Sequence, residues 1–341
     1  MSHFKIRWNH FALKLKHTFT ISRSSRTEVP VMFIELEKDG IIGFGEASPN
    51  ARYDETPEKV EAVFAGLNPE IFDSVNTPEE VEQALDALNI DVHCARFAIE
   101  MAWLDWWAKS QGQPLWKLWG AETPVGPVTS FTIGIDTVEN MVLKIKEADQ
   151  YPVYKVKLGT DHDHEIIKAI RSVTDKPIRV DANEGWKTVE QAVEEIDFLN
   201  GMDIELIEQP MPSSQFNDMV VLKSKATVPL AADESFIGDE DLEELSEGFH
   251  VINIKLMKIA SLVKAKRVLD NAHALGLKVM IGCMIESSLA NAAGALLGLW
   301  ADYVDLDGHV LISNDPFTGL TINGKGQIEL SHEPGFGISK R

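Results

Sequence analysis

Three acidic residues stand at the ends of three successive short apolar runs, and this repeat constrains the fold more than any other feature of the chain. Asp181, Glu208 and Asp233 close the runs 178–180, 204–207 and 230–232. Their spacings of 27 and 25 residues match one strand, one helix and their loops in a (β/α) barrel, where catalytic groups lie at the C-terminal ends of different strands. Carboxylate oxygens from three strands suit Mg²⁺. Any one of these acids alone would fit a helix N-cap equally well, but three in register predict a metal site.

The same rhythm places lysines on both sides of the three acids. Lys155 and Lys157 lie in the run 153–158, and Lys255 lies in the run 251–256. Alternate residues of a strand point to the same face, so Lys155 and Lys157 are expected to point the same way. The barrel mouth is therefore expected to hold lysines on opposite sides of a group of carboxylates.

This arrangement suits the removal of a proton from a carbon next to a carboxylate. Such a proton is weakly acidic, so it leaves only if a metal ion stabilises the developing enediolate while a base takes the proton. A lysine can be that base if neighbouring cations lower its pKa, a role that Lys155 and the metal would fill for Lys157. Lys255 on the other side would return the proton to the opposite face and so invert the stereocentre.

Five ordered motifs resemble the muconate-lactonizing subgroup of the enolase superfamily and span nearly the whole chain. They are Lys155-Val156-Lys157, Asp181-Ala182-Asn183, Ile207-Glu208-Gln209-Pro210, Ala232-Asp233-Glu234-Ser235 and Asn253-Ile254-Lys255-Leu256-Met257-Lys258. A further motif, Asp305-Leu306-Asp307, resembles the dipeptide epimerases of that subgroup. A lysine base with a Mg²⁺-stabilised enediolate is a known pattern of the superfamily. The resemblance implies an isomerase with Lys157 and Lys255 as catalytic residues, Asp181, Glu208 and Asp233 as Mg²⁺ ligands, and Asn183 and Glu234 just outside the ligands.

The resemblance also implies how a dipeptide is held. The carboxylates of Asp305 and Asp307 would bind its free α-ammonium group. An arginine from a mobile loop between the first two strands would contact the side chain of the second residue of the dipeptide. It would favour glutamate, because a guanidinium binds a carboxylate with two parallel hydrogen bonds. Arg26 fits that position better, and Arg23 stays a candidate. Further substrate contacts are expected at Thr132, Lys155, Cys283 and Ile285.

Other residues near these motifs receive a less specific interpretation. Lys258 lies three residues after Lys255, on the other strand face, and is expected to be a solvated or snorkelling lysine rather than a catalyst. The string Asp-His-Asp-His at 161–164 has metal-binding residue types but no further ligands nearby, so a solvated loop is expected. Residues 259–261 read Ile-Ala-Ser where the family often has a glycine pair, and Cys283 stands where some relatives have serine.

The expected fold class is α/β, an enolase-type (β/α) TIM-like barrel with an N-terminal α+β capping domain. Residues 1–122 are expected to form the capping domain, 123–310 the barrel with the active site, and 311–341 a C-terminal segment that packs back on the capping domain. Strands are predicted at 4–16, 31–38 and 40–46, and helices at 57–67, 77–88 and 92–111. Thr77 is the expected N-cap of the second helix. Trp103, Trp106 and Trp107 are interpreted as interdomain core rather than a ligand platform.

Composition limits the partners and the compartment. The chain has 341 residues, and 44% of them are hydrophobic. Its length exceeds the ~250 residues of a bare barrel. Its formal net charge of −21 argues against nucleic acid or an anionic membrane as a partner. Two cysteines give no disulfide framework, and no signal peptide or membrane span is expected. A cytoplasmic enzyme is therefore predicted, and a homo-oligomer is left open.

The predicted function is Mg²⁺-dependent epimerisation of the C-terminal residue of a dipeptide, with L-Ala-D-Glu and L-Ala-L-Glu from murein peptide recycling as the expected pair. An epimerase of another dipeptide specificity stays open. Muconate cycloisomerase and o-succinylbenzoate synthase would use the same lysines, but their substrates carry no ammonium group for Asp305 and Asp307. A non-catalytic barrel that binds dipeptides is the remaining alternative, and the presence of both lysines counts against it.

Overall fold

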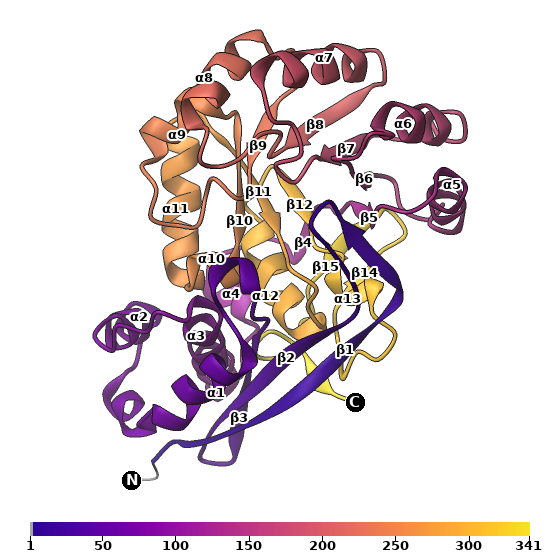
Figure 1. The fold of residues 1–341 in the computed structure, drawn as a ribbon. Helices are drawn as coiled ribbons and strands as arrows, with labels where there is room; N and C mark the ends of the chain where they lie inside the picture. The colour runs from indigo at the N-terminus through magenta and orange to yellow at the C-terminus, as the bar shows by residue number, and fades with distance from the viewer. Residues whose placement is uncertain (1–2) are drawn as a thin grey trace.

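A computed structural model describes residues 3–341, and its N-terminal part is an antiparallel sheet packed against helices (Figure 1). The sheet consists of β1 (Lys5–Ile21), β2 (Ser24–Lys38) and β3 (Ile41–Ala47), in that order. It is followed by η1 (Ala51–Tyr53), α1 (Pro57–Gly66), η2 (Pro69–Ser74), α2 (Pro78–Asp86), α3 (His93–Ser110) and α4 (Leu115–Leu118). The side chain of Thr77 accepts a hydrogen bond from Glu80 N and so caps α2, as predicted.

The hairpin of β1 and β2 is longer than predicted, and this corrects the expected mobile loop. Pairing continues through Phe19 opposite Arg26 to Ile21 opposite Ser24. The connection is therefore a turn of two residues that contains Arg23, and Arg26 lies on β2. The residues before the turn, Thr-Phe-Thr-Ile, are β-branched or aromatic and favour a paired strand. The turn reaches the barrel, where Ile135 N donates a hydrogen bond to Thr20 O (2.8 Å).

Eight parallel strands form the barrel, which confirms the predicted fold class. In chain order they are β5 (Phe131–Ile133), β6 (Tyr154–Lys157), β7 (Ile178–Asp181), β8 (Ile204–Glu208), β9 (Leu230–Ala232), β10 (Val251–Lys255), β11 (Lys278–Gly282) and β12 (Tyr303–Asp305). Neighbours in the chain are neighbours in the sheet, and Ser130 N donates to Val304 O (3.3 Å) where the last strand meets the first. Strands β6, β7 and β10 are buried along their whole length, as expected for strands covered on both faces.

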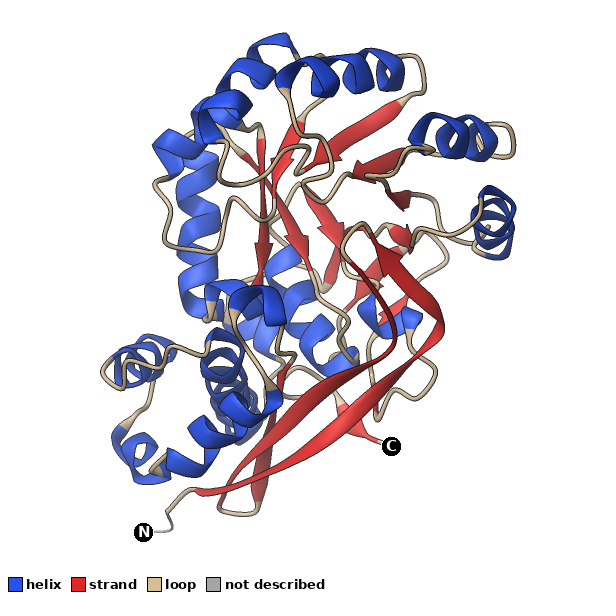
Figure 2. Cartoon of the chain, viewed as in Figure 1, coloured by secondary structure: helices blue, strands red, loops and turns tan. Residues whose placement is uncertain are grey.

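Helices cover the outside of the barrel (Figure 2). They are α5 (Val138–Glu147), α6 (Asp163–Arg171), α7 (Val189–Asn200), α8 (Phe216–Lys225), α9 (Leu242–Gly248), α10 (Leu256–Ile259), α11 (Leu262–Ala274) and α12 (Ser288–Gly298), and α13 (Gly308–Leu311) follows β12. Two small sheets complete the structure, from β4 (Val125–Val128), β13 (Phe317–Thr318), β14 (Thr321–Ile322), β15 (Gln327–Glu329) and β16 (Ser339–Lys340). No helix among residues 3–341 is long and apolar enough to cross a membrane.

Buried carboxylates of the N-terminal part cap helices of the barrel. Glu46, on β3, accepts hydrogen bonds from Ser287 N (2.9 Å), Ser287 Oγ (2.5 Å) and Ala290 N (3.1 Å) at the start of α12. Glu100, on α3, accepts from Leu262 N (2.7 Å) at the start of α11. The first N–H groups of a helix lack partners within it, so these contacts fix how the two parts pack. The domain boundaries expected at residues 122 and 310 stay predictions.

The tryptophan cluster lies within the N-terminal part, not between it and the barrel. Trp103 is fully buried and stacks on Trp107 at 6.1 Å. Trp106 Nε1 donates to Lys38 O (3.2 Å) and Trp107 Nε1 donates to Asn76 O (2.9 Å). The cluster therefore stabilises the capping sheet and its helices, and the expectation of interdomain core is corrected.

Candidate active site

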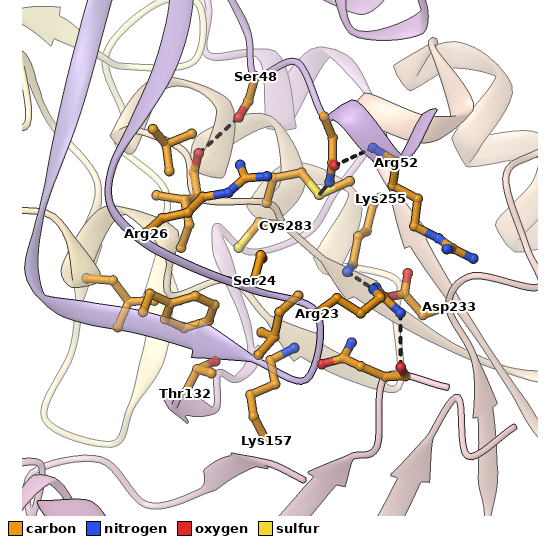
Figure 3. A pocket seen from close by; sticks show the side chains of 18 of the residues that line it. Arg23, Ser24, Arg26, Ser48, Arg52, Thr132, Lys157, Asp233, Lys255 and Cys283 are labelled. Carbon is orange, nitrogen blue, oxygen red and sulfur yellow. Dashed lines mark hydrogen bonds and ion pairs between the residues drawn. The ribbon is translucent and has the colours of Figure 1, made fainter. Parts of the chain in front are cut away.

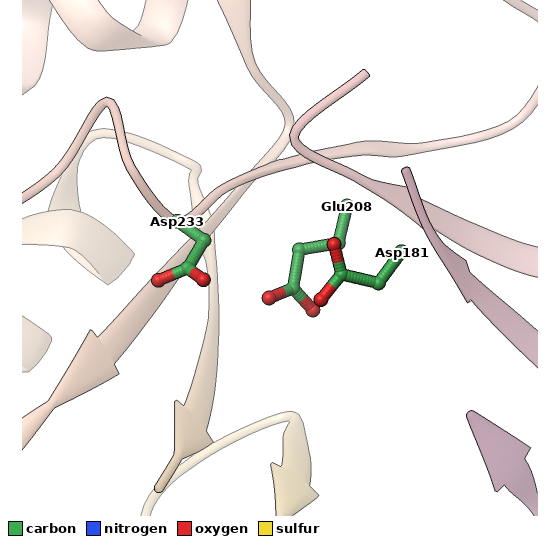
Figure 4. Close-up of side chains that lie close together, drawn as sticks. All are labelled: Asp181, Glu208 and Asp233. Carbon is green, nitrogen blue, oxygen red and sulfur yellow. The ribbon is translucent and has the colours of Figure 1, made fainter. Parts of the chain in front are cut away.

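The three acids expected to bind a metal meet at one end of the barrel. Asp181 and Glu208 are the last residues of β7 and β8, and Asp233 follows β9 directly. One carboxylate oxygen from each lies within 4.8 Å of the others, and all three side chains face a common space (Figure 4). They are buried, because Asp181 and Glu208 are 0% exposed and Asp233 is 3% exposed.

The charges around these acids fit a divalent cation. Burial and the charge of Asp181 raise the pKa of Glu208 to about 8, so this carboxylate lacks sufficient positive charge nearby. Glu208 Oε2 accepts no well-directed hydrogen bond, although Lys155 Nζ is 2.7 Å away. Burial would raise the pKa of Asp233, but Lys255 and Lys258 outweigh it and hold the value well below its usual range. Three hard carboxylates with one poorly satisfied oxygen are a donor set that suits Mg²⁺.

Two lysines approach the carboxylates from different strands. Lys157 Nζ lies 2.6 Å from Asp181 Oδ2, and Lys255 Nζ lies 2.8 Å from Asp233 Oδ2. Both lysines point into one cavity (Figure 3). Burial alone would lower the pKa of Lys255, but the negative charges of Asp233 and Glu208 outweigh it and raise the value.

Asp305 and Asp307 lie beside the first barrel strand. Asp305 Oδ2 is 2.7 Å from Lys155 Nζ, and Asp305 Oδ1 accepts from Ser130 Oγ (2.6 Å). Asp307 Oδ2 accepts from the backbone N–H of Thr132 (2.6 Å). Burial and the charge of Asp305 raise the pKa of Asp307 to about 7. An ammonium group placed here would relieve that repulsion.

A cavity of about 480 Å³ joins these groups. Thr132, Cys283 and Ile285 line it, as expected for substrate contacts. Cys283 Sγ donates to Asp305 O (3.4 Å), and Ile285 O accepts from Ser48 Oγ (3.0 Å). Burial raises the pKa of the Cys283 thiol well above its usual value, so this side chain shapes the cavity as a small neutral group.

The two candidate arginines differ in their partners. Arg26 lines the cavity and, within residues 3–341, its guanidinium makes no hydrogen bond or ion pair. Arg23 Nη2 donates to Glu234 Oε1 (2.6 Å), and Arg23 Nη1 donates to Glu184 Oε2 and Asn183 O (both 2.9 Å). The expected residues Asn183 and Glu234 therefore hold the hairpin turn as well as flanking the acids. Of the two arginines, Arg26 is the one with a guanidinium available to a ligand.

Lys258 corrects the sequence analysis. It is 2% exposed, not solvated, and its Nζ contacts Asp233 Oδ1 (2.7 Å) and Asp233 O (2.5 Å). The chain leaves the strand after Lys255 and enters α10, so the alternation of strand faces no longer applies at Lys258. Ala260, at the end of α10, takes the left-handed backbone (φ 66°) that glycine adopts more easily than other residues.

Residues 161–164 are only partly the solvated loop that was expected. Asp163 and His164 belong to α6, and Asp163 is 5% exposed. Its carboxylate accepts from Gly159 N (2.8 Å) and Thr160 N (2.9 Å), so it orders the loop after β6. His164 Nε2 lies 2.9 Å from Glu195 Oε2.

Gln209 is a residue that the sequence analysis did not single out. Its Oε1 accepts from Asp233 N and Ser235 N (both 3.0 Å), and its Nε2 donates to Met211 O (2.9 Å). It thus ties the end of β8 to the segment that carries Asp233. Its position directly after Glu208, in a buried motif, was the available signal.

Comparisons with known proteins agree with this geometry. Residues 5–120 match the mandelate racemase/muconate lactonizing enzyme N-terminal domain, and residues 138–341 match the enolase C-terminal domain-like family. The L-Ala-D/L-Glu epimerase of Bacteroides thetaiotaomicron is 41% identical over 98% of this chain and 88% of its own length. The L-Ala-D/L-amino acid epimerase of Flavobacterium johnsoniae is 37% identical over 98% and 99%. A dipeptide epimerase from Enterococcus faecalis, solved with Mg and L-Leu-L-Tyr, superposes with a TM-score of 0.87 at 28% identity over 99% of this chain and 100% of that one.

Proposed function

This chain belongs to the mandelate racemase/muconate lactonizing enzyme family of the enolase superfamily and is a Mg²⁺-dependent dipeptide epimerase, and we propose that Lys157 and Lys255 exchange the α-proton of its substrate. The preferred pair is L-Ala-D-Glu and L-Ala-L-Glu. Asp181, Glu208 and Asp233 hold the cation. The observation that carries the proposal is the placement of two lysines beside different carboxylates of one metal site.

The chain's own groups divide the work as follows. When bound, Mg²⁺ supplies positive charge that stabilises the substrate carboxylate as the α-proton leaves. Lys157 and Lys255 take or return that proton at Nζ, one on each face of the α-carbon. Asp305 and Asp307 hold the α-ammonium group of the first residue. Because the proton can return from the opposite side, the α-carbon is inverted.

A lysine can accept a proton only after it has lost its own. The carboxylates of Asp233 and Glu208 hold the pKa of Lys255 above its usual value, which opposes a role as base. When Asp233 and Glu208 hold a cation, their charge would be offset and the desolvation of Lys255 would act in the lowering direction. The metal therefore serves the base as well as the substrate.

Glutamate preference rests on Arg26. Its guanidinium lines the cavity without an ion-pair partner in the described chain, and a side-chain carboxylate would supply that partner. A glutamate dipeptide of this kind fits the recycling of murein peptides, and we propose the cytoplasm as its setting. The broader name of the Flavobacterium johnsoniae relative makes neutral second residues the alternative specificity.

A dipeptide library incubated in D₂O with Mg²⁺ tests the proposal. Each true substrate gains one mass unit at the exchanged α-carbon, and L-Ala-L-Glu is expected to exchange fastest. EDTA should stop the exchange and added Mg²⁺ should restore it. Exchange by no dipeptide would support a binding protein instead. Faster exchange of neutral dipeptides than of L-Ala-L-Glu would refute the glutamate preference alone.

A further inference from the structure

One buried carboxylate pairs with two of the three arginines of the N-terminal part that line the cavity. Glu184, in the loop after β7, is 8% exposed. Arg52 Nη2 lies 2.9 Å from Glu184 Oε1 and 2.8 Å from Oε2, and Arg23 Nη1 lies 2.9 Å from Oε2. Ser213 N, from the loop after β8, also donates to Glu184 Oε1 (2.9 Å).

The two arginines come from segments that cover the cavity. Arg23 lies in the turn between β1 and β2, and Arg52 lies in η1. Both residues line the cavity that contains Lys157 and Lys255 (Figure 3). A dipeptide in this cavity would lie against both segments, so the contacts that hold them in place would affect its retention.

The backbone under Glu184 is fixed for this contact. Asn183 and Glu184 both have positive φ values, 45° and 64°, which are uncommon for residues other than glycine. Glu184 N donates to Gln209 O (2.8 Å) and Lys187 Nζ donates to Glu184 O (2.5 Å). The carboxylate is therefore presented by a loop that is itself anchored, three residues after Asp181.

We infer that Glu184 is a positioning residue that latches the β1–β2 turn and the 51–53 segment over the bound dipeptide. The inference rests on the proposed function for its substrate, although the latch itself is a property of the ion pairs. Two partly buried guanidinium groups on one carboxylate form a charge-assisted network, in which each bond is stronger than a neutral one. Loss of the carboxylate removes the one contact that ties both segments to the same point, and leaves Arg23 with only Glu234 and the Asn183 carbonyl. The dipeptide then dissociates faster, while the lysines and the metal ligands stay in place.

Glu184→Gln tests the latch, because glutamine keeps the volume and the bond from Ser213 but removes the charge. We expect KM for L-Ala-L-Glu and for L-Ala-L-Met to rise together by about tenfold or more, with kcat changed by less than about threefold. Trypsin should also cleave after Arg23 or Arg26 faster than in the wild type, and a saturating dipeptide should slow that cleavage. Arg52→Gln should show the same pattern, and the double variant should add little.

The matched control is Glu82→Gln. Glu82 also pairs with an arginine across the two parts of the chain, because Arg267 Nη1 and Nη2 lie 2.6 and 2.7 Å from its carboxylate oxygens. That pair is remote from the cavity, so KM and trypsin cleavage in the hairpin should stay at wild-type values. Equal changes in both variants would show that Glu184 only stabilises the packing of the two parts. An unchanged KM and an unchanged cleavage rate in Glu184→Gln would overturn the latch.

The two proposals fail in different ways. If the wild type exchanged no dipeptide α-proton, the proposed function would fall, while the trypsin experiment would still report on the ion pairs. If the wild type were active and the Glu184→Gln and Arg52→Gln variants behaved like the wild type, the latch would fall and the proposed function would stand. A fall in kcat with KM unchanged would place Glu184 in the chemical step and would also contradict a latch.

Discussion

The Nζ atom of Lys155 lies 2.7 Å from Oδ2 of Asp305, so one buried ammonium group joins the proposed metal ligands to the pair proposed to hold the substrate amine. The same atom is 2.7 Å from Glu208 Oε2 and 3.2 Å from Asp181 Oδ2. Burial would lower the pKa of Lys155, but the charges of Asp305 and Glu208 outweigh it and hold the value well above its usual range. Lys155 therefore stays charged and balances an excess of buried negative charge.

Lys155→Met should destabilise the protein most when Mg²⁺ is removed. The substitution removes the nearest cation from the buried carboxylates of Glu208 and Asp305, which costs about 3–5 kcal/mol of unfolding free energy. Added Mg²⁺ binds some of the same carboxylates, so the loss should shrink. Urea unfolding with EDTA and with Mg²⁺ measures both values. Lys176→Met, which breaks an exposed pair with Asp149, should cost about 1 kcal/mol or less in both conditions. A loss of unfolding free energy in Lys155→Met that was the same with EDTA and with Mg²⁺ would contradict this account.

Lys157→Ala and Lys255→Ala should each abolish epimerisation, because inversion needs a proton donor on each face. Each variant should still exchange deuterium into the one stereoisomer whose α-proton faces the remaining lysine. Mass spectrometry of L-Ala-L-Glu and L-Ala-D-Glu after incubation in D₂O distinguishes the two. The two variants should show opposite preferences. Wild-type epimerisation by Lys255→Ala would rule out its role.

Gln209→Ala should weaken Mg²⁺ binding without removing a ligand. Its side chain accepts the backbone N–H groups of Asp233 and Ser235, so its loss lets the Asp233 segment move. Residues that orient ligands in this way typically contribute 10–100-fold to metal affinity, and we expect a loss of about that size in a calorimetric Mg²⁺ titration. Gln191→Ala is the control, because Gln191 likewise accepts a backbone N–H, from Lys187, but at the surface. Equal affinities in both variants would show that the contact does not hold Asp233.

Much of this site could be predicted from sequence because a parallel barrel repeats its geometry. Each short apolar run ends at the same edge of the sheet, so the residue that closes it is placed by the fold alone, as Asp181 and Glu208 are. That rule ends with the strand. Lys258 lies one turn into α10, where the strand alternation fails, and its contact with Asp233 follows from a bend that no local pattern encodes.

The remaining contacts depend on segments that are distant in sequence. Glu184 meets Arg23 and Arg52 only because the N-terminal hairpin and η1 fold over the barrel, at separations of 161 and 132 residues. The hairpin is longer than predicted because β1 and β2 stay paired through the segment that the resemblance assigns to a mobile loop. These contacts are set by how the two parts of the chain pack, which the sequence of either part does not specify by itself.

Glu46 should make stability depend on pH between about 4.5 and about 7. Burial raises the pKa of this carboxyl from 4.5 to about 7, so in this window the folded state binds more protons than the unfolded state. Stability from this group therefore falls as pH rises through the window and is level above it. Glu46→Gln removes the titration, and its unfolding free energy relative to wild type should rise from pH 5 to pH 8 by on the order of 2–3 kcal/mol. Glu79→Gln, at an exposed position, should show no such change.

Arg26→Ala should selectively impair the glutamate dipeptide. The guanidinium would contact the substrate side chain in both the ground state and the transition state, so kcat/KM for L-Ala-L-Glu should fall by roughly 10²-fold or more, given ~3 kcal/mol for a lost charge-assisted contact. Activity on L-Ala-L-Met should change much less. Arg23→Ala is the comparison, because Arg23 is already paired with Glu184 and Glu234 and its loss should raise KM for both dipeptides alike. A selective loss in Arg23→Ala with none in Arg26→Ala would exchange the two roles, and no selective loss in either variant would remove the reason for preferring glutamate.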